Sequence, residues 1–279
     1  MEKPLKYLLA KHGLTLKKVF GQNFLTDTAL LDQIVEKAGV TDKDTVLEIG
    51  CGAGALTTAL SKKAKKVVGY EIDTTLKPLL EEVLGDFDNV EIVFKDVMKE
   101  KLLEIEKKLG GEYILVANLP YYITTPIVMR FLEESTLIKG MVIMVQEEVA
   151  LRFASKESSS DYGAITVGIN LRGSAEVVLY VPREKFTPPP NVDSAVVKIV
   201  VDKGKFLGVD LKNVREVVKC GFSSRRKMLV NNLMNFYKIP RTVAENYLNS
   251  ANIALTARAE NLSAEDYVNL SNVIYEDNK

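Results

Sequence analysis

The sequence predicts an α/β protein with a mostly parallel sheet, followed by a small all-helical domain. In the first two-thirds of the chain, short apolar runs alternate with stretches of helical periodicity. This alternation is typical of a parallel sheet with helices on both faces. From about residue 203 the apolar residues follow the helical period alone. We therefore expect two domains, residues 1–202 and 203–279, with the glycine-containing stretch 203–210 as the linker.

The predicted parallel strands are apolar runs rich in β-branched residues, which suits strands buried on both faces. They lie at residues 45–50, 66–73, 90–97, 113–119 and 140–145. Two later runs, 175–182 and 194–201, flank a proline-rich loop. We expect them to be two further strands at the end of the sheet, forming an antiparallel pair.

The predicted helices between the strands include residues 26–40, with Thr26 or Asp27 as the N-cap, and residues 124–135. In the C-terminal domain, Ser263 followed by Asp266 resembles a capping box. The helices expected there cover residues 210–220, 225–236, 240–249 and 263–275.

The net charge of zero, from 37 basic and 37 acidic residues, is the sum of blocks of opposite sign. Residues 1–24 carry a net charge of +4 and residues 202–241 carry +7, whereas residues 25–201 carry −7 and residues 242–279 carry −4. Basic segments beside an acidic body indicate an anionic partner. The alternative is that these charges lie on solvated helix faces.

Several classes of protein are disfavoured by composition. The single histidine, His12, excludes a histidine-rich metal site, and Cys51 and Cys220 are too far apart to form a zinc finger. Reduced thiols are typical of the cytoplasm. No run approaches the ~20 apolar residues of a membrane helix, and the start of the chain lacks the apolar stretch of a signal peptide. We expect a cytoplasmic protein with no bound metal and no membrane attachment.

A glycine-rich turn follows the first strand directly, in the sequence Glu48-Ile49-Gly50-Cys51-Gly52-Ala53-Gly54. Glycines at such a turn let the backbone approach a ligand closely. The spacing is G-x-G-x-G, not the G-x-G-x-x-G of dinucleotide-binding folds. The spacing alone leaves the ligand open, and a tight strand-to-helix turn without a ligand is the alternative.

Two carboxylates follow the next strands. Glu71 ends the second strand, where a carboxylate can accept hydrogen bonds from both ribose hydroxyls of an adenosine. Asp96 ends the third strand and could accept a hydrogen bond from the adenine amino group. Taken singly, Glu71 could be a solvated charge and Asp96 a turn-forming residue. Together with the glycine turn, they predict a ligand that contains adenosine.

The fourth strand ends in Asn118-Leu119-Pro120-Tyr121, followed by Tyr122. This tetrapeptide resembles the signature of S-adenosylmethionine-dependent methyltransferases that act on exocyclic amino groups. Three further motifs resemble those of the rRNA adenine-N6 dimethyltransferases: residues 21–25 (GQNFL), residues 186–194 (FTPPPNVDS) and residues 222–227 (FSSRRK). Residues 258–263 are also similar. The resemblance runs from about residue 17 to the C-terminus.

The triple proline and the FSSRRK element resemble the KsgA branch, which modifies two adjacent adenines in a hairpin near the 3′ end of small-subunit (16S) rRNA. The Erm branch modifies one adenine in large-subunit rRNA, and its tetrapeptide tends to read NIPY. A non-catalytic ribosome-assembly factor with the same fold and an adenine-N6 DNA methyltransferase are further alternatives.

The resemblance implies a Rossmann-like class I methyltransferase sheet that binds S-adenosylmethionine. It implies that Gln22, Asn23 and Leu25 line the methionine end of this cofactor. The residues implied to contact the rest of it are Gly50, Gly52, Glu71, Asp96 and Asn118.

A mechanism follows for the target adenine. The side-chain carbonyl of Asn118 and the backbone carbonyl of Leu119 are expected to accept the two N–H bonds of the amino group. Pro120 fixes the chain and has no competing N–H. The base has to leave its stack to enter the pocket, where Tyr121 and Phe186 are expected to stack on its two faces.

For the RNA, we expect phosphate contacts from basic residues at the two ends of the chain. The candidates are Lys17, Lys18, Arg225, Arg226 and Lys227. The last three were expected at a helix start, where cations are mildly unfavourable unless an external anion is bound. The expected partner is small-subunit rRNA within a pre-30S particle, bound by a monomer.

Overall fold

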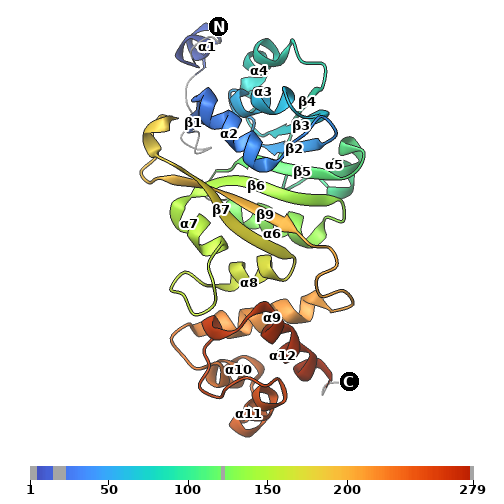
Figure 1. Cartoon of the computed structure of the whole chain (residues 1–279), viewed down its shortest axis with the longest axis vertical. Coiled ribbons are helices and arrows are strands. Elements are labelled where there is room, and N and C mark those ends of the chain that lie inside the picture. Colours follow the sequence, from blue (N-terminus) through green and yellow to red (C-terminus); the bar gives the residue numbers. More distant parts are fainter. Residues whose placement is uncertain (1–4, 15–22, 121–122, 277–279) are drawn as a thin grey trace. The chain divides into compact units, whose positions relative to one another are not determined.

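The computed structural model describes residues 5–14, 23–120 and 123–276, and these contain a seven-stranded sheet of order β4-β3-β2-β5-β6-β9-β7 (Figure 1). Strands β2 to β6 are parallel to one another, and β9 is antiparallel to β6. The predicted α/β class and all seven predicted strands are confirmed. The strands are β2 (Thr45–Ile49), β3 (Lys66–Glu71), β4 (Val90–Phe94), β5 (Tyr113–Asn118), β6 (Ile138–Gln146), β7 (Gly173–Val181) and β9 (Ser194–Val201).

Helices cover both faces of the sheet, as the strand–helix alternation predicts. Helices α2 (Thr28–Ala38) and α3 (Ala55–Ser61) pack on the face that carries Ile114 and Val116 of β5. Side chains alternate between the faces along a strand, so Tyr113 points to the other face. There its ring lies 6.5 Å from that of Phe131 in α6 (Thr124–Glu134). Helix α5 (Leu102–Leu109) lies against β2 and β3.

Helix α2 begins where the sequence indicates. Asp27 is its N-cap, and the Asp27 carboxylate accepts a hydrogen bond from the Leu30 N–H at 3.1 Å. Helix α6 differs in having no side-chain cap, because its N-cap is Ile123. The hydroxyl of Thr124, the first helical residue, donates to the Pro120 carbonyl at 3.3 Å. Two shorter helices are α1 (Leu5–Lys11), near the N-terminus, and α4 (Lys77–Leu84), which follows β3.

A two-stranded antiparallel ribbon, which the sequence patterns do not predict, joins two of the motifs. It pairs β1 (Phe24–Leu25) with β8 (Phe186–Thr187), so that Leu25 lies opposite Phe186. Each strand is two residues long, too short to show an alternating pattern. The ribbon places the segment ending in Leu25 directly beside the proline-rich loop.

The division into compact units differs from the expected one. One unit comprises residues 1–150 and 175–201, and the other comprises residues 151–174 and 202–279. The expected boundary after residue 202 lies within one residue of the last crossing between the units, but residues 151–174 belong to the helical unit. The reason is that Tyr162 and two residues of the same segment are buried in that unit's core.

The helical unit is built from α8 (Ala164–Asn170), α9 (Leu211–Gly221), α10 (Leu229–Tyr237), α11 (Arg241–Ser250) and α12 (Ala264–Glu276). The four predicted C-terminal helices are confirmed, with α10 starting four residues later than expected. The capping box is also present, because Ser263 Oγ accepts the Asp266 N–H at 3.1 Å and Asp266 accepts the Ser263 N–H at 2.9 Å.

The Cys51 side chain packs the glycine turn against the backbone of β3 at Gly69, a residue without a side chain. A methyl group added at Gly69 of β3 would lie 2.4 Å from Cys51 Sγ and 2.7 Å from Ile92 Cδ1. These distances are far inside van der Waals contact, so the turn sits this close to β3 only because residue 69 has no side chain. The structure therefore assigns Cys51 a packing role.

We expect Gly69→Ala to lower the free energy of unfolding by about 1–3 kcal/mol, the usual cost of overpacking a core. Urea unfolding followed by circular dichroism measures it. Adding Cys51→Ala should recover part of the loss, because it removes the closest contact. Wild-type stability of the Gly69→Ala variant would show that the turn is not packed in this way.

Candidate active site

A pocket opens at the carboxyl ends of β2, β3, β4 and β5, and it brings together the predicted site residues of the sheet unit. Those that line it are Asn23, Leu25, Gly50, Gly52, Glu71, Asp96, Asn118, Leu119, Pro120 and Phe186. Gln22, Tyr121, Lys17 and Lys18 lie outside the described residues. Open α/β sheets bind ligands at this edge.

The glycine turn is tied to Glu71 through a backbone hydrogen bond. Gly50 and Gly52 have φ angles of 80° and 56°, which favour glycine. The Gly52 N–H donates to one oxygen of Glu71 at 2.8 Å, and the Asp73 N–H donates to the other at 2.8 Å. A carboxylate oxygen has two lone pairs, so each can accept one further hydrogen bond. Glu71 can therefore hold a pair of neighbouring hydroxyls.

Burial raises the pKa of Glu71, while the backbone N–H groups of Asp73 and Gly52 lower it by stabilising the charged form. The side chain is only 5% exposed. Because Glu71 is buried, little water competes for its carboxyl oxygens, and their affinity for hydrogen-bond donors of a ligand is high.

Glu48 also lines the pocket, although the sequence analysis gave it no role. It is fully buried, and neither of its carboxylate oxygens has a hydrogen-bond partner among the described residues. Burial raises the pKa of Glu48 to about 8, and the nearby charge of Glu71 adds to the effect. A buried acceptor without a partner is costly, so this position suits a water or a ligand that carries donors or positive charge. The signal in the sequence was an acidic residue directly before the glycine turn.

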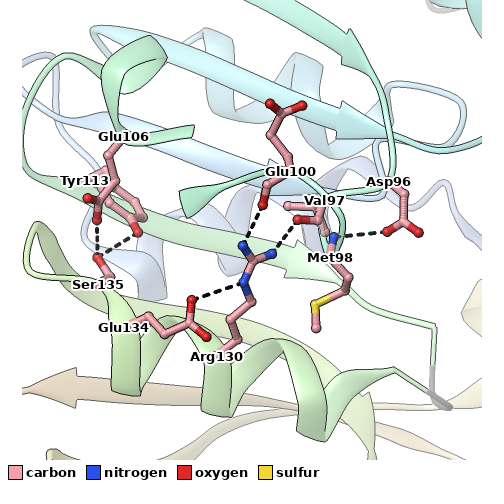
Figure 2. Close-up of polar contacts among 9 residues, drawn as sticks. All are labelled: Asp96, Val97, Met98, Glu100, Glu106, Tyr113, Arg130, Glu134 and Ser135. Atoms are coloured by element: carbon pink, nitrogen blue, oxygen red, sulfur yellow. Dashed lines mark hydrogen bonds and ion pairs between the residues drawn. The ribbon is translucent and has the colours of Figure 1, made fainter. Parts of the chain in front are cut away.

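Asp96 both forms a turn and lines the pocket, a position that is compatible with either role that the sequence left open. Its Oδ1 accepts the Met98 N–H at 3.0 Å, which makes it a turn-forming residue (Figure 2). It also lines the pocket, with a quarter of its side chain exposed. The backbone bond fixes the direction of the carboxylate, and an Asp can accept further bonds from a ligand.

Asn118 is the last residue of β5, and its side-chain nitrogen donates to the Asn23 carbonyl at 3.4 Å. This contact leaves the amide oxygen as the group that can accept a hydrogen bond from a ligand. The Leu119 N–H donates to the Met144 carbonyl of β6 at 3.4 Å. The Pro120 carbonyl accepts the Ile123 N–H at 3.1 Å. The segment 118–120, here called the shelf, is therefore held from both sides.

Two apolar residues also form part of the pocket wall. Phe186 lines the pocket from the ribbon and is buried to 4% exposure, so it also belongs to the core. Ile72 follows Glu71, lines the pocket and is 48% exposed. An exposed isoleucine beside a carboxylate suits the face of a planar ring. The sequence analysis missed Ile72 because a single apolar residue after a strand has no distinctive pattern.

The basic cluster Arg225-Arg226-Lys227 lies in the helical unit, and all three residues are exposed. It does not start a helix as expected, because α10 begins at Leu229 and the cluster occupies the preceding turn. The Arg225 guanidinium donates to the carbonyls of Ser160 and Tyr162 at 2.7 and 2.9 Å. Arg225 therefore holds its own unit together, whereas Arg226 and Lys227 present their charge to solvent.

The described part of the chain contains no group of three or more His, Cys, Asp or Glu side chains that could hold a metal ion. Its helices include none that is both long and apolar enough to cross a membrane. His12 Nε2 lies 2.7 Å from Glu82 Oε2 of α4, so His12 makes a structural contact.

Comparison with known proteins gives consistent matches. A family model described as ribosomal RNA adenine dimethylase matches residues 13–276. Ribosomal RNA small subunit methyltransferase A of Bacillus licheniformis is 44% identical over 97% of this chain and 95% of its own length. The protein of the same name from Geobacillus thermodenitrificans is 42% identical over 96% of this chain and 94% of its own.

Two solved structures are similar over most of the chain. A dimethyladenosine transferase from Plasmodium falciparum has a TM-score of 0.77 and 27% identity, covering 91% of this chain and 97% of its own. The 23S rRNA methyltransferase ErmE has a TM-score of 0.70 and 28% identity, covering 91% of this chain and all of its own.

The buried carboxyl of Glu48 predicts a pH dependence of stability. Its pKa is about 8 in the folded protein and about 4.3 in an unfolded chain. Between these values the folded state binds a proton that the unfolded state does not, so the free energy of unfolding falls as the pH rises. Relative to Glu48→Gln, the wild type should lose about 1.4 kcal/mol per pH unit in this window. Urea unfolding at pH 5.5, 6.5 and 7.5 measures the difference.

The exposed Glu81 provides a control, since Glu81→Gln should keep the pH slope of the wild type. Parallel stability curves for the wild type and Glu48→Gln would contradict the assignment.

Proposed function

The chain belongs to the ribosomal RNA adenine dimethylase family, and on this premise we propose that it dimethylates N6 of two adjacent adenines in the 3′-terminal hairpin of small-subunit (16S) rRNA. The observation that carries the proposal is the single pocket in which the shelf lies beside Glu71 and Asp96. Relatives that are 40–44% identical over nearly their full length are named small subunit methyltransferases, which supports the choice of rRNA.

The cofactor is S-adenosylmethionine, which supplies an electrophilic methyl group on a sulfonium centre. The pocket residues fit it. Glu71 can accept the two ribose hydroxyls, and Asp96 can accept the adenine amino group. Glu48 places a second buried carboxyl group at the pocket wall, and positive charge on a ligand would favour its ionised form. Asn23 and Leu25, with Gln22 just before them, are proposed to line the methionine end.

The shelf provides the chemistry that the chain itself performs. The lone pair of an adenine amino group is delocalised into the ring, which makes the nitrogen a poor nucleophile. The Asn118 side-chain oxygen and the Leu119 carbonyl are proposed to accept its two N–H bonds, which favours a tetrahedral nitrogen with an aimed lone pair. Holding the reacting atoms in such a geometry can remove about 7–11 kcal/mol of barrier. No histidine base is needed in this scheme.

The target base has to be unstacked before it reaches the shelf. Tyr121 and Phe186 are proposed to stack on its two faces, which is worth about 1–3 kcal/mol per base. The ribbon pairing of Leu25 with Phe186 supports this, because it places Phe186 on the pocket wall. Phosphate contacts are proposed for Lys17 and Lys18 and for the basic cluster.

In the cell, we propose that the enzyme acts in the cytoplasm as a monomer on a pre-30S particle. The names of the small-subunit relatives support this setting. An Erm-type activity on large-subunit rRNA is less well supported, because ErmE shares 28% identity with the chain against 44% for the first small-subunit relative. The intact shelf and glycine turn favour an active enzyme over a non-catalytic assembly factor.

The proposal is tested by incubating the protein with S-adenosylmethionine and unmethylated 30S particles, 50S particles or DNA. Digested nucleosides are then analysed by mass spectrometry. We expect N6,N6-dimethyladenosine at two adjacent positions of 16S rRNA only. Asn118→Ala should lower kcat by about 100-fold, as the loss of one preorganised hydrogen bond does in other active sites. Dimethyladenosine confined to 50S particles, or none at all, would reject the proposal.

Binding to RNA gives a separate prediction. Changing Arg226 and Lys227 together to Ala should make the plot of log binding constant against log salt concentration less steep. The magnitude of its negative slope should fall by up to about two, because each phosphate contact contributes about one. Arg225→Ala should also lower the melting temperature, since it breaks two backbone contacts. Filter binding to a 16S hairpin at several salt concentrations measures the slope.

The paired variant Lys37→Ala/Lys43→Ala removes equal charge from the other unit and should leave the slope unchanged. Equal slopes in all variants would exclude the basic cluster from the RNA contact.

A further inference from the structure

We propose that Arg130 is a positioning residue that sets the direction of the Asp96 carboxylate towards the cofactor. The inference rests on the proposed function and extends it to a side chain outside the pocket lining. Arg130 acts through a single peptide group, which lies between its guanidinium and Asp96. None of the motifs discussed above includes Arg130.

The loop that carries Asp96 has little structure of its own. It runs from the end of β4 at Phe94 to the start of α5 at Leu102, and residues 95–101 form only turns and bends. The Lys99 and Glu100 N–H groups donate to the Asp96 carbonyl at 3.0 and 3.2 Å. These local bonds shape the turn, but they do not attach it to the rest of the sheet unit.

Arg130 provides that attachment from α6 (Figure 2). Its Nη1 donates to the Val97 carbonyl at 2.5 Å, and its Nη2 donates to the Glu100 carbonyl at 2.6 Å. The side chain is 12% exposed. Hydrogen bonds from a charged donor with little access to water are strong, so Arg130 holds both ends of the turn that follows Asp96.

The contact with Val97 reaches Asp96 directly. The Val97 carbonyl and the Met98 N–H belong to one planar peptide group. Arg130 binds the oxygen of this group, and its N–H donates to Asp96 Oδ1 at 3.0 Å. Fixing the oxygen fixes the plane and therefore the N–H, and a charged donor on the oxygen also polarises the N–H. The carboxylate direction at the pocket thus depends on Arg130.

The same helix also holds the shelf. At its beginning, the Ile123 N–H and the Thr124 hydroxyl bind the Pro120 carbonyl at 3.1 and 3.3 Å. Arg130 lies nearly two turns further along α6. Helix α6 therefore fixes both the shelf, where the target amino group is proposed to bind, and the loop at the adenine end of the cofactor.

An arginine suits this position better than a lysine. Two different nitrogens of one planar guanidinium bind two carbonyls, which the single nitrogen of a lysine cannot do with the same geometry. Nε faces Glu134 Oε2 at 3.5 Å, and the Glu134 side chain is 57% exposed. The Glu134 contact therefore lies at the surface, and it can be removed without touching the two carbonyl bonds.

The experiment compares two ligands by isothermal titration calorimetry: S-adenosylhomocysteine, and S-inosylhomocysteine, which has an oxygen in place of the adenine amino group. The wild type should prefer the adenosyl ligand by about tenfold or more, the effect of one lost hydrogen bond to a charged acceptor. Arg130→Met should lower this preference to about twofold or less, because Asp96 is no longer aimed at the amino group. Arg130→Lys should give an intermediate preference. The matched control Glu134→Gln should behave as the wild type.

A purely structural role would weaken both ligands equally and leave the preference unchanged, so an unchanged preference in Arg130→Met would overturn the inference. If the Met variant does not fold, as judged by thermal melting, the preference of Arg130→Lys decides in the same way. Absence of S-adenosylhomocysteine binding by the wild type would instead contradict the proposed function, and the inference would fall with it.

Discussion

The site depends on one constraint, the parallel pairing of β2 with its neighbours β3 and β5. In a parallel sheet all the carboxyl ends lie at the same edge, so the pairing of Ile49 with Tyr70 and of Glu48 with Val116 decides which side chains meet there. The glycine turn, Glu71 and Asn118 follow those strand ends. The short ribbon then closes the pocket with Leu25 and Phe186, which are 161 positions apart in the sequence.

Charge is divided between a pocket that suits a cationic cofactor and exposed residues that suit an anionic polymer. Glu48 and Glu71 lie buried next to the glycine turn, where burial raises the pKa of both carboxyl groups. Positive charge on a ligand would relieve that cost. The exposed basic residues Arg226 and Lys227 belong to the other compact unit. The buried carboxyl groups and these two exposed basic residues thus lie in different units, and the overall charge of zero conceals this distribution.

The sequence predicted the strands and most helix limits, because apolar runs and cap residues reflect local preferences, and it singled out the strand-end residues that line the pocket. It could not predict the ribbon, since two-residue strands have no period. The placement of residues 151–174 was wrong for a related reason: buried residues such as Tyr162 look the same whichever core they enter. Arg130 was missed because its partners are backbone carbonyls, which any residue supplies. Glu48 had a visible signal, but its lack of partners emerges only in three dimensions.

The central claim is that the adenosine end of the cofactor lies at Glu71 and Asp96, while its reactive end faces the shelf. A crystal structure of the protein with S-adenosylhomocysteine tests this most directly. The account predicts both ribose hydroxyls on Glu71, the adenine amino group on Asp96 and the sulfur next to Asn118. A ligand bound in the reverse direction, or at another site, would contradict it.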